Sequence, residues 1–129
     1  MIVLDTSVLI AFFSGADAHH VAATELLAAA GAEDLVVSSM TLAELLVGPA
    51  REGAVDALLK ALARLEVGEE LFPEDVAVRL ARLRAETGLK MPDCCVLLAA
   101  ESAGAATVGT FDGRLGQVAR GRGLTVVGV

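Results

Sequence analysis

Aromatic residues are scarce in this sequence: they make up 3% of its 129 residues, and Trp and Tyr do not occur. Basic residues are few as well, with 10 Lys and Arg against 17 Asp and Glu and a net charge of -7. A general electrostatic grip on nucleic acid needs a basic surface, so this balance argues against one. Any contact with nucleic acid must be local, or must depend on a metal ion that reverses the local charge.

Long uninterrupted apolar runs are also missing. No stretch of the sequence is long enough and apolar enough to span a bilayer, and no basic leader precedes a cleavage site. We therefore expect a soluble, cytoplasmic protein that has no membrane partner.

Cysteine occurs twice, at the adjacent positions Cys94 and Cys95. Neighbouring Cα atoms lie about 3.8 Å apart, which is less than the roughly 4.4–6.8 Å that a disulfide spans. Zinc sites need cysteine pairs at a longer spacing. We predict that both thiols are small buried apolar groups, as expected in a reducing compartment.

What the sequence does contain is apolar residues. They form 55% of the chain and give a mean hydropathy of +0.66, which predicts a compact fold. The length suits a single domain over residues 1–129. Most of the apolar residues are Ala, Leu and Val, and part of this surface is expected to face a partner.

Hydrophobic periodicity predicts alternating strands and helices. The predicted strands cover residues 1–4, 34–38, 65–67, 105–109 and 125–129. The predicted helices cover residues 6–14, 18–30, 41–47, 54–65, 73–87, 92–103 and 114–119. Asp17 is the expected N-cap of the second helix, and Gly48-Pro49 the stop of the third. This order predicts an α/β fold with a central, mostly parallel sheet of four to five strands and helices on both faces.

Four acidic residues stand at unusual places in this pattern. Asp5 and Asp112 follow predicted strands, Asp93 opens an apolar helix, and Glu44 is the one charge in an apolar helical segment. Each has an ordinary structural explanation: a helix N-cap for Asp5, a helix-dipole acid for Asp93, a turn residue for Asp112 and a solvent-facing stripe for Glu44. Glu44 is the hardest to explain in this way, because a buried, unpaired carboxylate is costly.

Taken together, the four acids predict a metal site. Ligands gather at the carboxyl ends of parallel strands, where at least three of the acids are expected. Carboxylates that share a pocket repel one another, and a divalent cation removes the conflict. A ligand set of oxygens without His or Cys selects Mg²⁺ or Mn²⁺ over zinc. The predicted chemistry is hydrolysis of a phosphodiester bond.

Four segments also carry a family resemblance: "LDTSVLIAF", "LAELLVG", "PDCCVLLAA" and "GTFDGRL". In this order and spacing they resemble PIN-domain ribonucleases, and most of all the VapC-type toxins of toxin–antitoxin pairs. The resemblance covers essentially the whole chain. It implies a PIN-like domain that hydrolyses RNA with Mg²⁺ or Mn²⁺, an antitoxin protein as partner, and a homodimer.

The resemblance also assigns residues. It implies that the metal ligands are Asp5, Glu44, Asp93 and Asp112, and that the hydroxyls of Thr6 or Ser7 and of Thr110 position ligands or substrate. Two departures from the family pattern occur: the Cys pair after Asp93, and Gly113-Arg114-Leu115 where the family often has a further acid or an aromatic residue. The second departure bears on whether a second metal site exists.

Few residues are available to grip RNA. Arg114, Arg120 and Arg122 lie near Asp112 and are candidates for phosphate contacts. The helical arginines at positions 79, 82 and 84 are expected to form a solvated face. Phe111 can stack on a base or pack in the core. His19 and His20 are expected to be exposed residues at a helix start, without a catalytic role.

Dehalogenase-like enzymes and receiver domains also place an aspartate after a strand. A dehalogenase-like enzyme needs a second aspartate two residues after the first, where this chain has Ser7. A receiver domain needs a lysine after a late strand, and neither Lys60 nor Lys90 follows one. A PIN-like module that binds RNA or protein without cleaving remains the alternative to a nuclease.

Overall fold

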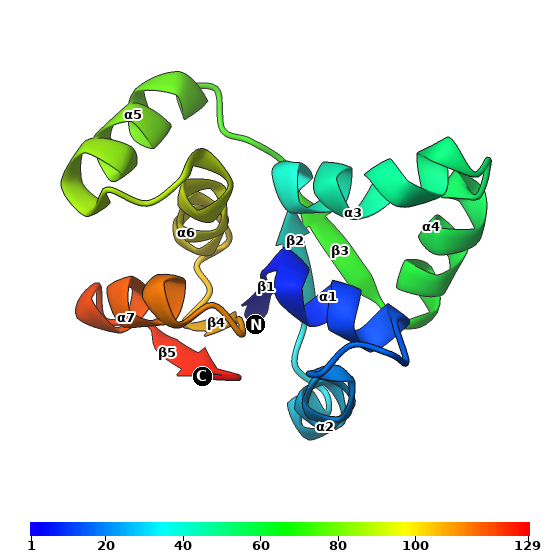
Figure 1. Cartoon of the computed structure of the whole chain (residues 1–129). Coiled ribbons are helices and arrows are strands. Elements are labelled where there is room, and N and C mark those ends of the chain that lie inside the picture. The colour runs from blue at the N-terminus through cyan, green and yellow to red at the C-terminus, as the bar shows by residue number, and fades with distance from the viewer.

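The computed structural model describes all 129 residues, as five strands and seven helices (Figure 1). The strands are β1 (Ile2–Leu4), β2 (Leu35–Ser38), β3 (Val67–Glu70), β4 (Thr107–Gly109) and β5 (Thr125–Val127). The helices are α1 (Thr6–Phe13), α2 (His20–Ala30), α3 (Ser39–Arg51), α4 (Val55–Arg64), α5 (Val76–Thr87), α6 (Met91–Ala103) and α7 (Gly113–Gly121). The predicted α/β class is confirmed.

All neighbouring strands of the sheet are parallel, in the order β3-β2-β1-β4-β5. The central strand β1 is buried on both faces, because Ile2 and Leu4 point to one core and Val3 to the other. Burying a Leu or Val side chain contributes about 1.5–3 kcal/mol, so both cores hold the sheet in register.

The two cores correspond to two groups of helices. One core joins Val3 and Val108 to side chains of α5, α6 and α7, and the other joins the opposite side of the sheet to α1, α2, α3 and α4. Figure 1 shows these groups on the two sides of the strands. The predicted arrangement of helices on both faces is therefore correct.

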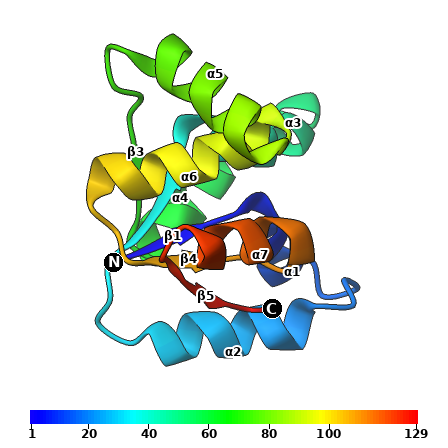
Figure 2. The same ribbon diagram turned by 90° about the vertical axis from the view of Figure 1, so that its left-hand side faces the viewer.

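The strands end at one edge of the sheet, and this edge positions the site. One residue separates β1 from α1, α3 begins directly after β2, and three residues separate β4 from α7. In Figure 2, α6 and α7 run back across the sheet, from this edge toward the edge where the N-terminus lies. The starts of four helices therefore surround the carboxyl ends of β1 and β4.

The prediction that Gly48-Pro49 stops the third helix is wrong. Helix α3 continues through Pro49 to Arg51. Proline lacks an N–H donor, but it stands in the last turn, where the carbonyl of Pro49 accepts hydrogen bonds from the amides of Glu52 and Ala54. The helix also starts earlier than predicted, because the Ser38 hydroxyl accepts from the amide of Thr41 and caps it.

Asp17 is not the N-cap of α2, contrary to prediction. The helix begins at His20, and Asp17 Oδ1 instead accepts from the amide of His19 in the preceding turn at 2.8 Å. The other boundaries differ from prediction by up to three residues, and the largest shift is that of the third strand, predicted at residues 65–67 and found at Val67–Glu70. No helix is long and apolar enough to cross a membrane.

Candidate functional site

Asp5 begins the site, because it links β1 to α1. It is the N-cap of α1, and its Oδ1 accepts from the amide of Thr6 at 2.8 Å. Its other oxygen, Oδ2, accepts from the hydroxyls of Ser7 and Thr110, each at 2.9 Å. The side chain is 9% exposed, and these three donors hold a nearly buried carboxylate in one orientation.

The hydroxyls of Ser7 and Thr110 extend this network to the segment after β4. Ser7 Oγ accepts from the amide of Phe111 at 3.0 Å, and Thr110 Oγ1 accepts from the amide of Asp112 at 2.9 Å. Each hydroxyl therefore donates to Asp5 and accepts from the neighbouring backbone. In this arrangement both hydroxyls orient a carboxylate and fix the loop that carries Asp112.

Glu44 lies across from the start of α1. Its Oε1 accepts from the Thr6 hydroxyl at 3.1 Å. The side chain is exposed, so Glu44 is not a desolvated carboxylate, and its ordinary explanation as part of a solvent-facing stripe is correct. Helix α3 is amphipathic: Thr41 and Leu45 are buried, whereas Glu44 faces solvent beside the site.

Asp93 carries the clearest electrostatic signature of the site. Burial, together with the negative charges of Asp5, Asp112 and Glu44, raises the pKa of its carboxyl from 3.8 to about 6, while the charge of Lys90 partly opposes this rise. The carboxylate is half-buried and has no hydrogen-bond partner. Each of the other three predicted acids therefore acts on Asp93, which places all four in one electrostatic neighbourhood.

Asp112 occupies the N-cap of α7. Its Oδ1 accepts from the amides of Arg114 at 2.9 Å and Leu115 at 3.1 Å. Asp112 is therefore more than the turn residue that the sequence suggested. It caps a helix, and its charge raises the pKa of Asp93.

The acids are near one another without forming a finished ligand set. No group of three or more His, Cys, Asp or Glu side chains is arranged to hold a metal ion. The donors fit a divalent cation that prefers oxygen: all four are carboxylates, and the unpartnered Asp93 has a raised pKa that such a charge would lower.

Arg114 and Lys90 are the cations beside these acids. Arg114 follows Asp112, and its Nη2 donates to the carbonyl of Gly88 at 3.2 Å, which ties α7 to the loop before α6. Lys90 is exposed, and its charge acts on Asp93. Sequence reasoning missed Lys90, although it stands three residues before Asp93.

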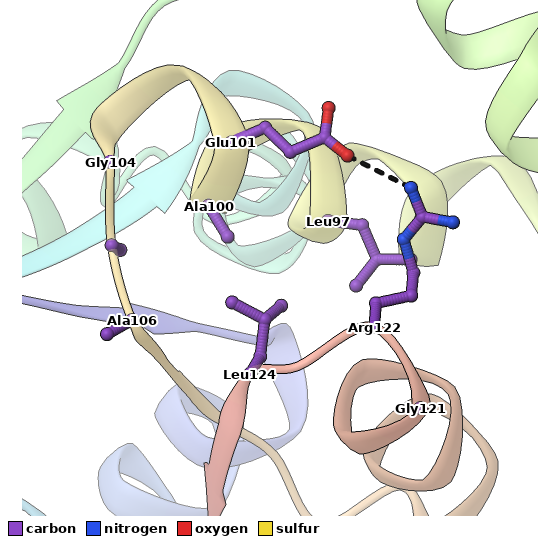
Figure 3. Close-up of a pocket in the computed structure, with 9 residues that line it drawn as sticks. Leu97, Ala100, Glu101, Gly104, Ala106, Gly121, Arg122 and Leu124 are labelled. Carbon is purple, nitrogen blue, oxygen red and sulfur yellow. Dashed lines mark hydrogen bonds and ion pairs between the residues drawn. The ribbon is translucent and has the colours of Figure 1, made fainter.

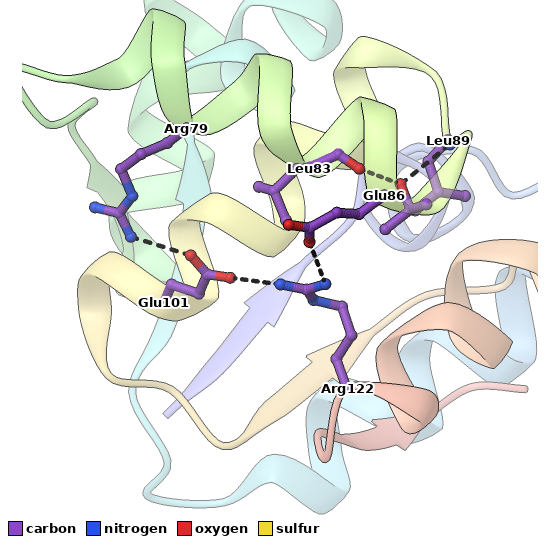
Figure 4. Close-up of polar contacts among 7 residues, drawn as sticks. Arg79, Leu83, Glu86, Leu89, Glu101 and Arg122 are labelled. Carbon is purple, nitrogen blue, oxygen red and sulfur yellow. Dashed lines mark hydrogen bonds and ion pairs between the residues drawn. The ribbon is translucent and has the colours of Figure 1, made fainter.

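The other candidate arginines are engaged elsewhere. Arg120 donates to the carbonyl of Val129. Arg122 forms ion pairs with Glu86 and Glu101, each at 3.2 Å, and Arg79 pairs with Glu101 at 3.0 Å (Figure 4). Because these guanidinium groups already have partners, they are less available for phosphate than Arg114.

A cavity of about 600 Å³ lies beside this ion-pair network, near the start of β4 (Figure 3). Leu97, Ala100 and Leu124 form its apolar wall, and Glu101 and Arg122 lie at its rim. It sits at the edge of the sheet where the strands begin. The largest hollow of the molecule is therefore not where the acids gather.

The two cysteines are free and buried in α6, as predicted. Burial raises the pKa of both thiols, that of Cys95 to about 11. Thiolate is the nucleophilic form, so neither residue can serve as a covalent catalyst near neutral pH.

His19 makes a contact that the sequence did not predict. It is exposed at the start of α2, as expected, but its ring stacks on that of Phe111 with centroids 4.8 Å apart and planes at 12°. Phe111 also packs against the core on the α1 side of the sheet. No local signal could have found this pair, because 91 residues separate the two in the chain.

The site combines a strand-end carboxylate held by two hydroxyls with a half-buried Asp93 on which the charges of the other three acids act. The family model of the PIN domain matches residues 2–121. The chain belongs to the PIN-domain family. No curated protein matches it in sequence.

Solved structures of PIN-domain toxins and complexes resemble this one. A toxin–antitoxin complex from Klebsiella pneumoniae contains a chain 27% identical to this one, with a TM-score of 0.72 and 87% of each chain covered. The toxin VapC20 of Mycobacterium tuberculosis, described as cleaving the sarcin–ricin loop, is 22% identical, with a TM-score of 0.72 and 92% of this chain and 95% of that one covered. VapBC2 of Rickettsia felis, bound to a promoter DNA fragment, has a chain 24% identical, with a TM-score of 0.67 and coverage of 98% and 97%.

The fold of this PIN domain is therefore similar to the folds of VapC and FitB toxins. Nucleases of this family generally use divalent metals, which agrees with the oxygen-rich site.

Proposed function

We propose that this PIN-domain protein is a Mg²⁺- or Mn²⁺-dependent ribonuclease and the toxin of a toxin–antitoxin pair. The observation that carries the proposal is the electrostatics of Asp93. Its carboxyl has a pKa raised to about 6 by burial and by Asp5, Asp112 and Glu44. Helix capping accounts for Asp5 and Asp112, but no structural contact accounts for the half-buried, unpartnered Asp93, whereas a metal-dependent hydrolase needs such a carboxylate beside other acids.

Each residue has a role in this proposal. Asp5, Glu44, Asp93 and Asp112 hold the ion, and the hydroxyls of Ser7 and Thr110 keep Asp5 in its ligating orientation. Mg²⁺ or Mn²⁺ supplies a more acidic water and positive charge against the phosphate. One of the carboxylates accepts the proton of the attacking water.

Substrate binding relies on few cations. Lys90 and Arg114 flank the acids and are suited to the phosphates on either side of the cleaved bond. Thr6 keeps Glu44 beside Asp5 through its hydroxyl. The net charge of -7 disfavours broad RNA binding, which supports a grip limited to this edge.

The toxin assignment rests on the relatives and on exposed apolar side chains. The chain from Klebsiella pneumoniae comes from a toxin–antitoxin complex. Several large apolar side chains of this chain are exposed, among them Ile10 at 47%, Val47 at 47% and Leu71 at 71%. We propose that such surface is covered by an antitoxin and by a second copy of the chain, in the cytoplasm.

An RNA-cleavage assay tests the nuclease proposal. Purified protein is incubated with total RNA in Mg²⁺, in Mn²⁺ and in EDTA, next to the variants Asp5→Asn and Glu44→Gln. We expect cleavage in both metals, none in EDTA, and a loss of about 100-fold or more in each variant, since even a residue that merely orients a metal ligand is worth roughly 10–100-fold. Glu25→Gln, an exposed acid of α2, is the matched control and keeps full activity.

Two results would overturn the proposal. Equal RNA loss in EDTA and in the variants would identify a contaminating nuclease. RNA binding without cleavage in any metal would favour the binding module. Copurification of the chain with a small protein encoded beside it, and release of activity when that protein is removed, tests the toxin assignment separately.

A further inference from the structure

The stacked pair of His19 and Phe111 lies beside the acidic site, to which Phe111 is joined by hydrogen bonds. The backbone amide of Phe111 donates to Ser7 Oγ, and that hydroxyl donates to Asp5 Oδ2. Phe111 also stands between Thr110, which contacts Asp5, and Asp112. The pair is therefore built onto the same backbone segment that carries the acids.

His19 leaves a flat ring surface open to solvent. One face of its imidazole is covered by Phe111, with ring planes at 12°, and the residue is nevertheless exposed. The ring forms no hydrogen bond and no second ring stacks on it, so we take its opposite face as the surface available to a ligand. A flat ring fixed on one face and open on the other can accept a stacked nucleobase.

The position of His19 is fixed in advance. Asp17 Oδ1 accepts from the amide of His19 at 2.8 Å, and the ring of the next residue, His20, contacts the carbonyl of Ala11 through Nδ1 at 2.8 Å. The first bond lies within the turn between α1 and α2, and the second attaches the start of α2 to α1. A preorganised ring loses little conformational entropy when a base stacks on it.

The composition of the chain makes this pair important. Without Trp or Tyr, and with four Phe, the protein has few rings that can stack on bases. The other aromatic pair, Phe12 and Phe13, meets edge-on at 83° at the end of α1. The stack of His19 and Phe111 is the parallel one, and it is the one joined to the acidic site.

We propose that His19, supported by Phe111, is a stacking platform for a nucleobase that flanks the phosphate at the acidic site. This inference rests on the proposed ribonuclease function, and it names how the site holds single-stranded RNA despite its negative charge. His19 is a substrate-positioning residue, and it takes no part in proton transfer. Stacking accepts any base, so the platform adds affinity without strong sequence preference.

Binding of two matched oligomers tests the platform. Oligoadenylate and an abasic ribose-phosphate oligomer of equal length carry the same charge and differ in their bases. Both are titrated against protein with the Glu44→Gln change, which keeps the RNA intact. We expect this protein to prefer oligoadenylate by about 5- to 150-fold, the range that stacking of one base provides. Adding His19→Ala removes the preference, and adding His19→Phe keeps it.

A fluorescent variant gives a second measurement. Because the chain has no Trp, His19→Trp introduces a single reporter at the platform. We expect oligoadenylate to quench its emission and the abasic oligomer to leave it unchanged. Val21→Ala, which truncates an exposed side chain two residues further along, is the control and keeps the preference for bases.

The outcomes separate this inference from the ribonuclease proposal. If wild-type protein cleaves RNA but His19→Ala keeps the preference for bases, the platform is wrong and the nuclease stands. If base preference depends on His19 but no metal supports cleavage, the platform stands and the nuclease proposal fails. Equal affinity for the two oligomers before any change at His19 overturns the platform directly.

Discussion

Thr110 donates its hydroxyl to Asp5 Oδ2 at 2.9 Å, across 105 positions of the chain. The pairing of β1 with β4 sets this contact, because Leu4 and Gly109 are partners in the sheet and the next residues, Asp5 and Thr110, leave it at the same level. The parallel register therefore brings a carboxylate and its donor together. A shift of one residue in that register would separate them.

The first prediction concerns this contact. Thr110→Val keeps the shape of the side chain and removes the hydroxyl that serves Asp5 and the amide of Asp112. Hydrogen bonds to charged groups contribute about 1.5–3 kcal/mol, so we expect the free energy of unfolding to fall by that amount. Cleavage should fall roughly 10-fold or more, because Asp5 loses its orientation.

Urea denaturation and the RNA assay measure the two effects. Thr107→Val, in strand β4 just before Thr110 and without a side-chain hydrogen bond, is the matched control and stays close to wild type. Wild-type stability and activity in Thr110→Val would show that the hydroxyl has no orienting role.

The second prediction concerns pH. Burial and the neighbouring acids raise the pKa of Asp93 from 3.8 to about 6. Between these values the folded protein holds a proton at Asp93 that the unfolded chain has lost, so the free energy of unfolding of the metal-free protein falls as pH rises through this window. We expect Mg²⁺ to restore stability above pH 6, and to have little effect near pH 4, where protons compete for the carboxylates.

Thermal melting at a series of pH values, with and without Mg²⁺, measures this dependence. Asp93→Asn removes the titrating group, so we expect a higher melting temperature than wild type above pH 6 and a smaller gain from Mg²⁺. Asp34→Asn, an exposed aspartate before β2, controls for the loss of one surface charge. A wild-type melting temperature that rises between pH 4 and 6 without metal would contradict the assignment.

Part of the acidic site could be predicted from the sequence. Asp5 and Asp112 were predictable, because the end of an apolar strand is visible in the sequence and parallel strands end at one edge. The exposure of Glu44 was one of two alternatives, since a charged residue among apolar neighbours on a helix can face either the core or solvent, and the structure shows the solvent-facing one. The contact of Ser7 with Phe111 and the stack of Phe111 on His19 depend on tertiary packing, which leaves no local pattern.

The boundary errors have a similar cause. Pro49 is a strong stop by propensity, yet α3 runs two residues past it, and the amides of Glu52 and Ala54 donate to the carbonyl of Pro49 where the helix ends. Asp17 is a good N-cap by type, but it bonds to the amide of His19 before α2 begins. Local rules gave the elements, and the packing around them chose the ends.

The third prediction concerns Gly128, which follows β5 beside the site. Its φ is +106°, a conformation that disfavours side chains, and an added Cβ would overlap the carbonyl oxygen of Thr110. We expect Gly128→Ala to lower the free energy of unfolding by about 1–3 kcal/mol or more, as strained backbone does, and to weaken cleavage by moving Thr110. Gly121→Ala, with an ordinary φ and open space in α7, should raise stability by about 0.5–1 kcal/mol.

Chemical denaturation of the two alanine variants provides the comparison. A Gly128→Ala protein as stable as wild type would mean that the end of the chain can move away from Thr110 without cost. Loss of stability with full cleavage would mean that Asp5 does not depend on Thr110 for its position.

The last prediction separates two arginines that the sequence grouped together. Arg114 stands beside Asp112 and spends one nitrogen on the carbonyl of Gly88, so the rest of its guanidinium is free for phosphate. Arg122 lies in the ion-pair network with Glu86 and Glu101, at the edge of the sheet where the strands begin. We expect Arg114→Ala to raise KM about 10-fold with little change in kcat, because a phosphate contact away from the reacting bond binds substrate and transition state alike. Arg114→Lys should recover part of that loss.

Arg122→Ala should leave both constants within about twofold of wild type and cost under about 1 kcal/mol of stability, as exposed ion pairs do. Equal kinetic losses in the two alanine variants would show that RNA extends across the molecule to the edge of the Arg122 network, and the substrate path drawn from the acidic site would then be too short.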